Sequence, residues 1–181
     1  MEDHERPTVP AYRTCDRRYP FLWTSALQPA GRWHDRGEGP CHDFATTAKG
    51  AWAEVVRHEE ITDLLDLLDL ERSLWGVEVV QPEVVPMLGE EILTGGVSSY
   101  PACRAEAHRL RAGGATGLRA PSAAVRSGRA PRTRLERDAQ VVTEAVPTEV
   151  LVVWGDPHAL TAMPLAEGHP DPNVLDDVRP L

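Results

Sequence analysis

The run AWAEVVRH at residues 51–58 decides more of the local fold than any other stretch of this sequence. Apolar residues at positions 48, 51, 52, 55 and 56 recur at helical spacing, and Thr46 or Thr47 stands where an N-cap is needed. The pattern predicts a helix between Thr47 and Glu60. At about 100° per residue, Glu54 falls outside the apolar stripe, so core packing does not account for this carboxylate.

The tripeptide GRW at residues 31–33 precedes that helix across a polar loop, with Arg32 placed 22 positions before Glu54. An arginine beside an aromatic ring, joined by a helix glutamate, is what a pocket for an anionic, sugar-bearing ligand needs. The plainer alternatives are a surface charge for Arg32, a core ring for Trp33 and a solvated side chain for Glu54. Spacing alone leaves both interpretations open.

Length and composition indicate one globular domain, because 181 residues with 41% hydrophobic content are enough to bury a core. The three cysteines, Cys15, Cys41 and Cys103, are far apart and form no CxxC pair, which favours reduced thiols. No run approaches the roughly eighteen apolar residues of a membrane span, and residues 1–6 are too polar and acidic for a signal peptide. We therefore expect a cytoplasmic protein.

The formal net charge of −9 argues against generic binding to nucleic acids or to anionic membranes, because such surfaces neutralise phosphates with a clustered positive face. Any anionic ligand must therefore be held by local groups. Lys49 is the only lysine, so these groups would be arginines, whose forked guanidinium suits phosphate. The base composition of the gene explains the same bias equally well.

Turn residues and apolar runs predict the remaining elements. We expect a flexible arm at residues 1–10, a short strand beginning at Tyr12, loops over 17–40, a short helix or a turn over 64–70, a strand over 72–80, a helix over 102–112 that Gly113 and Gly114 end, strands over 117–120, 141–146 and 150–154, and a helical turn near 173–178. Residues 126–138 carry five arginines and few apolar anchors, which predicts a mobile surface loop. Residues 11–181 would then form a single domain.

Common catalytic and nucleotide-binding motifs are missing from the sequence, including the Walker motif, GxGxxG, HExxH and GxSxG. His58 lacks the second histidine that a zinc-binding helix needs, so metal catalysis has no positive support. What remains is a set of separated polar residues, in which Arg13 and Ser122 join Arg32 and Glu54. By itself, a serine after a proline is more often a turn or an N-cap.

Taken together and in order, these residues resemble the RES-domain family, which is named for an arginine, a glutamate and a serine. The resemblance runs from Tyr12-Arg13 through GRW at 31–33, AWAEV at 51–55 and APSA at 120–123 to the strand ending at Trp154-Gly155. It implies a compact α+β domain similar to the ADP-ribosylating toxins, with small β-sheets flanking a cleft and a few helices. Family members are typically toxins of bacterial toxin–antitoxin pairs that consume NAD by hydrolysis or phosphorolysis, and some ADP-ribosylate a protein.

The resemblance assigns the family's arginine, glutamate and serine to Arg32, Glu54 and Ser122, and a second arginine to Arg13. One position departs from the family pattern. Eleven residues before the glutamate, where the family usually has a pocket tyrosine, this chain has Asp43. A carboxylate there removes a ring on which nicotinamide or ribose can pack, and it adds negative charge near an anionic ligand. The alternatives are therefore an NAD-degrading enzyme, a catalytically impaired nucleotide- or protein-binding module, an ADP-ribosyltransferase, and an enzyme for another ribosyl substrate.

Cleavage of the nicotinamide–ribose bond leaves positive charge on the sugar, so the site must grip the pyrophosphate and stabilise an oxocarbenium-like carbon. The resemblance implies that Arg32 and Arg13 hold the phosphates and that Glu54 binds a ribose hydroxyl opposite the developing cation. Ser122 would position the nicotinamide ribose or amide, and Trp33 would stack on a ring unless it belongs to the core. The expected partners are NAD, as substrate, and a cognate antitoxin protein. No metal, nucleic acid or membrane is expected, and the formation of a homo-oligomer is left open.

Overall fold

The computed structural model describes residues 7–181 except 20, 23, 26, 137–138 and 157–159, and it describes no side chain between residues 133 and 142. The strands are β1 (Thr8–Cys15), β2 (Cys41–Ala45), β3 (Arg72–Val80), β4 (Gly117–Pro121), β5 (Arg129–Glu136), β6 (Ala139–Pro147), β7 (Glu149–Trp154) and β8 (Thr161–Gly168). The helices are α1 (Ala48–His58), α2 (Leu64–Leu68), α3 (Glu90–Leu93) and α4 (Tyr100–Ala112), with 3-10 turns η1 (Val97–Ser99) and η2 (Pro172–Asp177).

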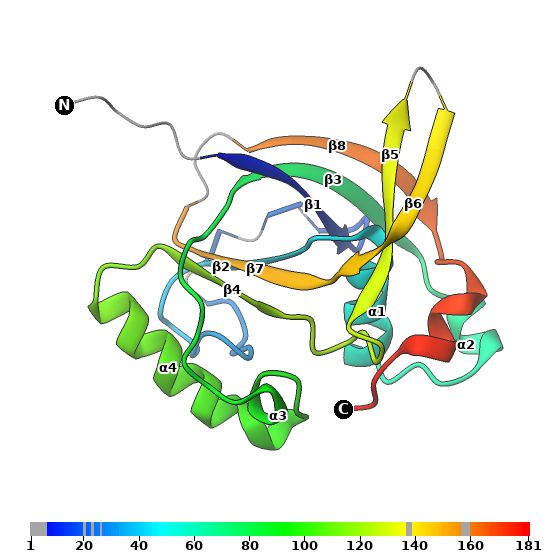
Figure 1. Ribbon diagram of the computed structural model, residues 1–181. Helices are drawn as coiled ribbons and strands as arrows, with labels where there is room; N and C mark the ends of the chain where they lie inside the picture. The colour runs from blue at the N-terminus through cyan, green and yellow to red at the C-terminus, as the bar shows by residue number, and fades with distance from the viewer. Residues whose placement is uncertain (1–6, 20, 23, 26, 137–138, 157–159) are drawn as a thin grey trace.

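The main sheet is antiparallel and has six strands in the order β4-β7-β2-β1-β3-β8 (Figure 1). β1 pairs with β3 along its whole length, and β2 pairs with β7 in the same way. Between β1 and β2, however, the register contains a single pair, Tyr12 opposite Ala45. The two halves of the sheet therefore meet at one point and open away from it.

Helices cover the two halves of the sheet separately. α1 packs against β1 through Trp52, Val55 and Val56, all buried, whereas α4 packs against β4 and β7. In β7, Val150 and Val152 face α4, while Leu151 lies in a third cluster with Phe44 on the opposite face, as strand alternation requires. Figure 1 shows α3 and α4 below β4, and the β5–β6 ribbon projecting beyond the sheet.

Several elements agree with the sequence predictions. α1 lies within the predicted range, and the Thr47 hydroxyl caps it by accepting the amide of Gly50 at 3.1 Å. β3 has the predicted bounds, and α4 and β7 differ from the predictions by one or two residues. Residues 64–70 contain a short helix, α2, whose Leu64, Leu65 and Leu68 are exposed. The predicted α+β class is confirmed.

The predicted N-terminal arm at 1–10 and the predicted loop at 126–138 are each wrong in part, because both contain strand residues. Residues 8–10 belong to β1 rather than to an arm, because their backbone pairs with Glu78, Val79 and Val80 at the end of β3. The arginine-rich segment at 126–138 is largely β5, which pairs with β6 as a two-stranded ribbon. A ribbon outside the main sheet needs no apolar alternation, so composition gave no strand signal. Residues 1–6, 137 and 138 lie outside the described residues.

β2 and β8 were not predicted from the sequence at all. β8 is an edge strand with mostly exposed side chains, and β2 has only five residues. Neither offers enough alternation to be recognised without its neighbours. Among the described residues, every helix is too short or too polar to cross a lipid bilayer.

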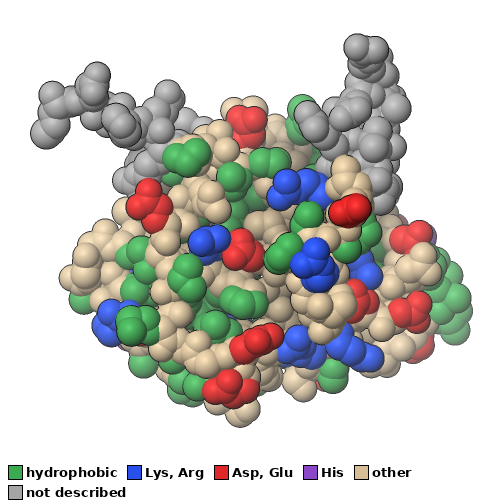
Figure 2. Space-filling model, in the orientation of Figure 1, with side chains coloured by type: hydrophobic (Ala, Val, Ile, Leu, Met, Phe, Trp, Pro, Cys, Tyr) green, Lys and Arg blue, Asp and Glu red, His purple; other side chains and the backbone are tan. Residues whose placement is uncertain are grey.

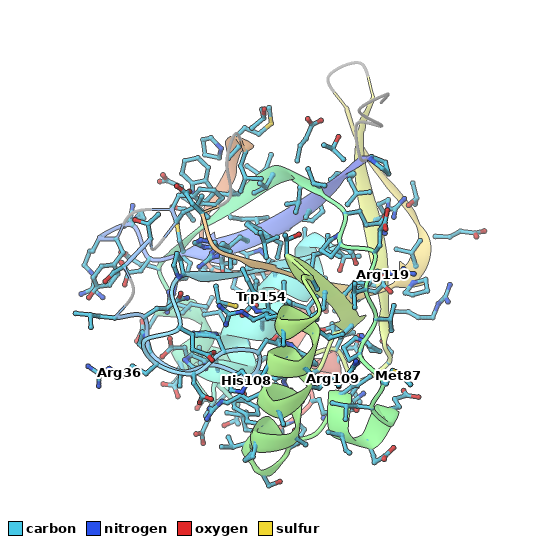
Figure 3. The ribbon with its side chains drawn as sticks, turned by 90° about the vertical axis from the view of Figure 1, so that its left-hand side faces the viewer. Arg36, Met87, His108, Arg109, Arg119 and Trp154 are labelled. Atoms are coloured by element: carbon cyan, nitrogen blue, oxygen red, sulfur yellow. The ribbon has the colours of Figure 1, made fainter. Side chains whose placement is uncertain are left out.

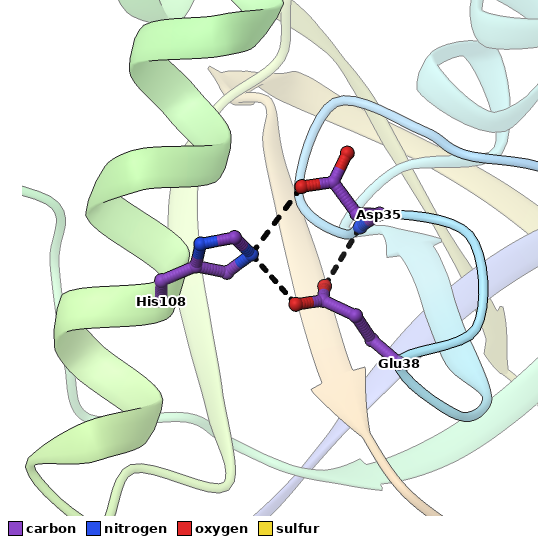
Figure 4. A group of neighbouring side chains, drawn as sticks. All are labelled: Asp35, Glu38 and His108. Carbon is purple, nitrogen blue, oxygen red and sulfur yellow. Dashed lines mark hydrogen bonds and ion pairs between the residues drawn. The ribbon is translucent and has the colours of Figure 1, made fainter.

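The loop before β2, which carries Arg32, is anchored to α4. The Nε of Arg104 donates to the carbonyl of Gly31 at 2.8 Å, and its Nη1 lies 3.1 Å from Asp35. His108, labelled on α4 in Figure 3, places its Nε2 2.6 Å from a Glu38 oxygen (Figure 4). These contacts join α4 to the loop and so restrict where Arg32 can lie.

We expect His42, in β2, to make the stability of the fold depend on pH. His42 is fully buried, and burial together with the nearby charge of Arg13 lowers its pKa from 6.5 to about 4. Between these values the unfolded chain binds a proton on this imidazole and the folded chain does not. The free energy of unfolding should therefore fall by up to about 3 kcal/mol as the pH drops through this window.

The measurement is urea denaturation across this pH range for the wild type and His42→Leu. The variant should show a shallower dependence on pH, because it has no imidazole to protonate. Equal slopes for the two proteins would contradict the assignment.

Candidate functional site

A cleft of about 520 Å³ lies where the sheet opens between β1 and β2. Residues of β1, β2, α1 and the loop that contains Arg32 line it, including Arg13, Arg32, Trp33, Asp43, Phe44, Glu54, Arg57 and Tyr100. The cleft thus brings together the residues predicted from separate parts of the sequence. Ser122 lies beside it, since Pro121 and Ala123 are in the lining.

Glu54 and Ser122 are joined by a direct hydrogen bond. The buried Ser122 hydroxyl donates to Glu54 Oε1 at 3.0 Å and accepts the amide of Ala124 at 3.2 Å. Loss of hydration in the cleft raises the pKa of Glu54 above its ordinary value, the bond from Ser122 lowers it, and the charge of Asp43 raises it further. α1 therefore presents a carboxylate that a single fixed hydroxyl orients.

Arg32 is held by the backbone rather than by a carboxylate. Its Nη2 donates to the carbonyl of Gly95 at 2.6 Å, while Nη1 donates to the carbonyls of Ile92 and Leu93 and to Ser99 Oγ. The guanidinium also stacks over Tyr100, 4.6 Å from the ring centre. In this arrangement Arg32 supplies a fixed positive charge, and its terminal nitrogens are already engaged.

Arg13 and Asp43 stand on the two strands that diverge at the opening. The guanidinium of Arg13 lies over the Phe44 ring, 5.7 Å from its centre, and its Nη1 is buried with no hydrogen-bond partner among the described residues. Burial lowers the pKa of Arg13, which the charge of Asp43 opposes. The Asp43 side chain is open to the cleft, where the surrounding protein raises its pKa and Arg13 lowers it. An orphaned N–H in a cleft is a feature that a ligand acceptor can satisfy.

Trp33 belongs to the core. It is 3% exposed, packs in the cluster beneath α4, and accepts a hydrogen bond at its carbonyl from Trp154 Nε1 at 3.2 Å. This agrees with the plainer alternative for that ring. Tyr100, in contrast, lines the cleft and was not singled out in the sequence.

Arg57 was also overlooked, although it stands three residues after Glu54 on the same helix. It is 4% exposed and lines the cleft with Arg32. Its position one turn from the glutamate was the available signal, since residues three apart share a helix face.

One group of potential metal ligands lies outside the cleft. Asp35, Glu38 and His108 place a ligand atom each within 4.8 Å of one another (Figure 4). Arg104 pairs with Asp35, and Arg111 lies 3.2 Å from Glu38, so both carboxylates already have cationic partners. These contacts suit a cross-link between the loop and α4 better than a cation site.

Charge is mixed on the face of the molecule that Figure 2 shows. Basic and acidic side chains are interspersed on the face shown in Figure 2, which fits the net charge of −9. An anion is therefore attracted by the arginines of the cleft rather than by the protein as a whole.

A split antiparallel sheet with a glutamate, a serine and fixed arginines at its opening defines an α+β domain built around one polar cleft. The family model of the RES domain matches residues 10–132, a span that contains Arg13, Arg32, Asp43, Glu54 and Ser122. The chain belongs to the RES-domain family, as the sequence predicted.

A solved structure has the same fold. The chain superimposes with a TM-score of 0.61 on the crystal structure of the M. tuberculosis MbcT–MbcA toxin–antitoxin complex, at 16% sequence identity and with coverage of 88% of this chain and 85% of that one. At this identity the likeness extends to the fold alone. No curated protein matches the sequence.

We expect two substitutions to move the pKa of Glu54 in opposite directions. Ser122→Ala removes a donor to the carboxylate and should raise this pKa, whereas Asp43→Asn removes a neighbouring negative charge and should lower it. Carboxyl ¹³C NMR titration of labelled protein measures both shifts, with Glu54→Gln used to identify the signal. A shift of the same sign in both variants would contradict this geometry.

Proposed function

We propose that this protein is a toxin-type enzyme that degrades NAD by cleaving its nicotinamide–ribose bond. The observation that carries the proposal is the Glu54–Ser122 hydrogen bond at the edge of a cleft that also holds Arg13, Arg32 and Arg57. This combination offers negative charge for a sugar cation and positive charge for a pyrophosphate. The cleft volume of about 520 Å³ is within the usual range for small-molecule sites.

Cleavage of this bond requires no general acid. When the C–N bond breaks, its electron pair goes to the pyridine nitrogen, so nicotinamide leaves neutral and the ribose carbon becomes positive. Glu54, held by Ser122, would face that carbon and bind a ribose hydroxyl, while water or phosphate attacks and completes hydrolysis or phosphorolysis. Because only the ionised carboxylate stabilises a cation, activity should be lost as the pH falls through the raised pKa of Glu54.

Arg13 and Arg32 would contribute to phosphate binding in different ways. Arg13 has a buried Nη1 with no acceptor among the described residues and would turn it to a phosphate, whereas Arg32 would act mainly through its charge unless it releases a backbone carbonyl. Tyr100 lies under Arg32 and offers a ring surface in the cleft. It is a candidate for the packing role that Trp33 is too buried to fill.

Asp43 favours a second candidate function, a RES-fold module that binds a nucleotide or a protein with little turnover. Its carboxylate faces the cleft near Glu54 and repels an anionic ligand. Transfer of ADP-ribose to a protein is a further variant, in which a protein side chain replaces water as the acceptor.

A cognate antitoxin is the partner that we propose, acting on the protein in the cytoplasm. The support is family membership together with the fold shared with the MbcT–MbcA toxin–antitoxin complex.

Purified protein should release nicotinamide from NAD, and Glu54→Gln should lower kcat by about 10²- to 10³-fold, the usual effect of removing one preorganised electrostatic partner. Chromatography with and without phosphate identifies the acceptor from the sugar product. Glu83→Gln, an exposed glutamate outside the cleft, is the matched control and should retain wild-type activity. Equal rates for wild type and Glu54→Gln would exclude the enzymatic proposal.

Asp43→Tyr separates the two candidate functions. If Asp43 impairs an otherwise complete site, the tyrosine variant should release nicotinamide at least several-fold faster than wild type, because it regains a ring and loses a negative charge. Calorimetric titration with NAD should show tighter binding in the same variant. Tight binding of NAD without turnover in either protein would favour the binding module.

A further inference from the structure

Arg57 is a buried cation whose described hydrogen bonds all go to backbone carbonyls. Its Nη1 donates to Ala123 at 2.7 Å, and its Nη2 donates to Gly95 at 2.9 Å and to Pro180 at 3.2 Å. No carboxylate pairs with it within 4 Å among the residues that the structure describes. The side chain is 4% exposed.

These carbonyls belong to the segments that hold the other site residues. Ala123 directly follows Ser122, so one branch of the guanidinium fixes the backbone that carries the serine. Gly95 also accepts from Arg32 Nη2, so the other branch shares a carbonyl with the second arginine. Glu54 precedes Arg57 by three residues on α1, which places both side chains on one helix face.

Burying a guanidinium without a close carboxylate is costly, and packing two arginines on one carbonyl adds repulsion. Loss of hydration and the charge of Arg32 accordingly lower the pKa of Arg57, while Glu54 raises it. A structural role would be served at less cost by a neutral side chain. The positive charge of Arg57 therefore points to a negatively charged group in the cleft that it stabilises. Glu54 is such a group, and it lies on the same helix.

We propose that Arg57 is a positioning residue of the cleft, which ties the Ser122 segment and the Gly95 carbonyl to α1 and so sets Glu54, Ser122 and Arg32 in one fixed arrangement. This inference deepens the proposed function and rests on it for the kinetic test alone. The planar fork matters, because a lysine ammonium is a point charge that cannot span the same carbonyls with the same geometry.

The first test is the pKa of Glu54, which requires no turnover. Four groups act on that carboxylate: Ser122, Arg57 and Arg32 lower its pKa, and Asp43 raises it. Carboxyl NMR titration should therefore show a higher pKa for Glu54 in Arg57→Gln and a value closer to wild type in Arg57→Lys, which keeps the charge. An unchanged pKa in Arg57→Gln, accompanied only by a lower Tm, would reduce Arg57 to a structural role and overturn the proposal.

The second test is kinetic. In Arg57→Lys, kcat for nicotinamide release per folded molecule should fall by about 10²-fold, the cost of a misplacement of roughly 1 Å, with a smaller change in KM. Arg119→Gln is the control, because Arg119 is a half-buried arginine that pairs with Glu149 and lies outside the residues that line the cleft. A kcat equal to wild type in Arg57→Lys would contradict the proposal.

Neither variant needs to fold for the idea to be tested. In the wild type, the guanidinium ¹⁵N–¹H signals of Arg57 should show slow rotation and slow proton exchange, because both terminal nitrogens are bound. Free rotation of this group would overturn the proposal. If wild type releases no nicotinamide while the guanidinium of Arg57 shows slow rotation and Arg57→Gln shifts the pKa of Glu54, the proposed function fails and the positioning role stands.

Discussion

The single register pair between β1 and β2 is the constraint on which the rest of the structure depends. β1 continues along β3 and β2 continues along β7, so each strand is satisfied on its outer side. Tyr12 and Ala45 are the one register pair between β1 and β2, and residues of both strands line the cleft that opens there. α1 packs beside this opening, so Glu54 lines the same cleft as Arg13 of β1 and Asp43 of β2.

Backbone carbonyls accept most of the described hydrogen bonds of Arg32 and Arg57 in this cleft. Gly95 accepts from both Arg32 and Arg57, and neither arginine is neutralised by a close carboxylate among the described residues. The charge of these two arginines is therefore not offset by an ion pair. Arg104 and Arg111 of α4, in contrast, form ion pairs with Asp35 and Glu38. Such a distribution reconciles an acidic protein with a local site for an anion.

Asp43 changes the charge of the cleft without changing the backbone of β2. It occupies a regular position in β2, paired with Val152 of β7, so the carboxylate leaves the strand intact. In the cleft it partly offsets Arg13 and raises the pKa of Glu54. Asp43 therefore influences the pKa of Glu54 without changing the strand pairing of the fold.

The sequence by itself determined the elements with strong local patterns, namely α1 with its Thr47 cap, β3 and α4, and it identified Arg13, Arg32, Glu54 and Ser122 as candidates through their order along the chain. Local pattern carried no signal for β2, β5 or β8, whose formation depends on neighbouring strands. Only the tertiary structure decided that Trp33 is a core ring, that Ser122 donates to Glu54, and that Arg57 and Tyr100 belong to the cleft. The physical reason is that hydrogen bonds between residues some 40 to 70 positions apart depend on how the two halves of the sheet diverge, and no local periodicity encodes that geometry.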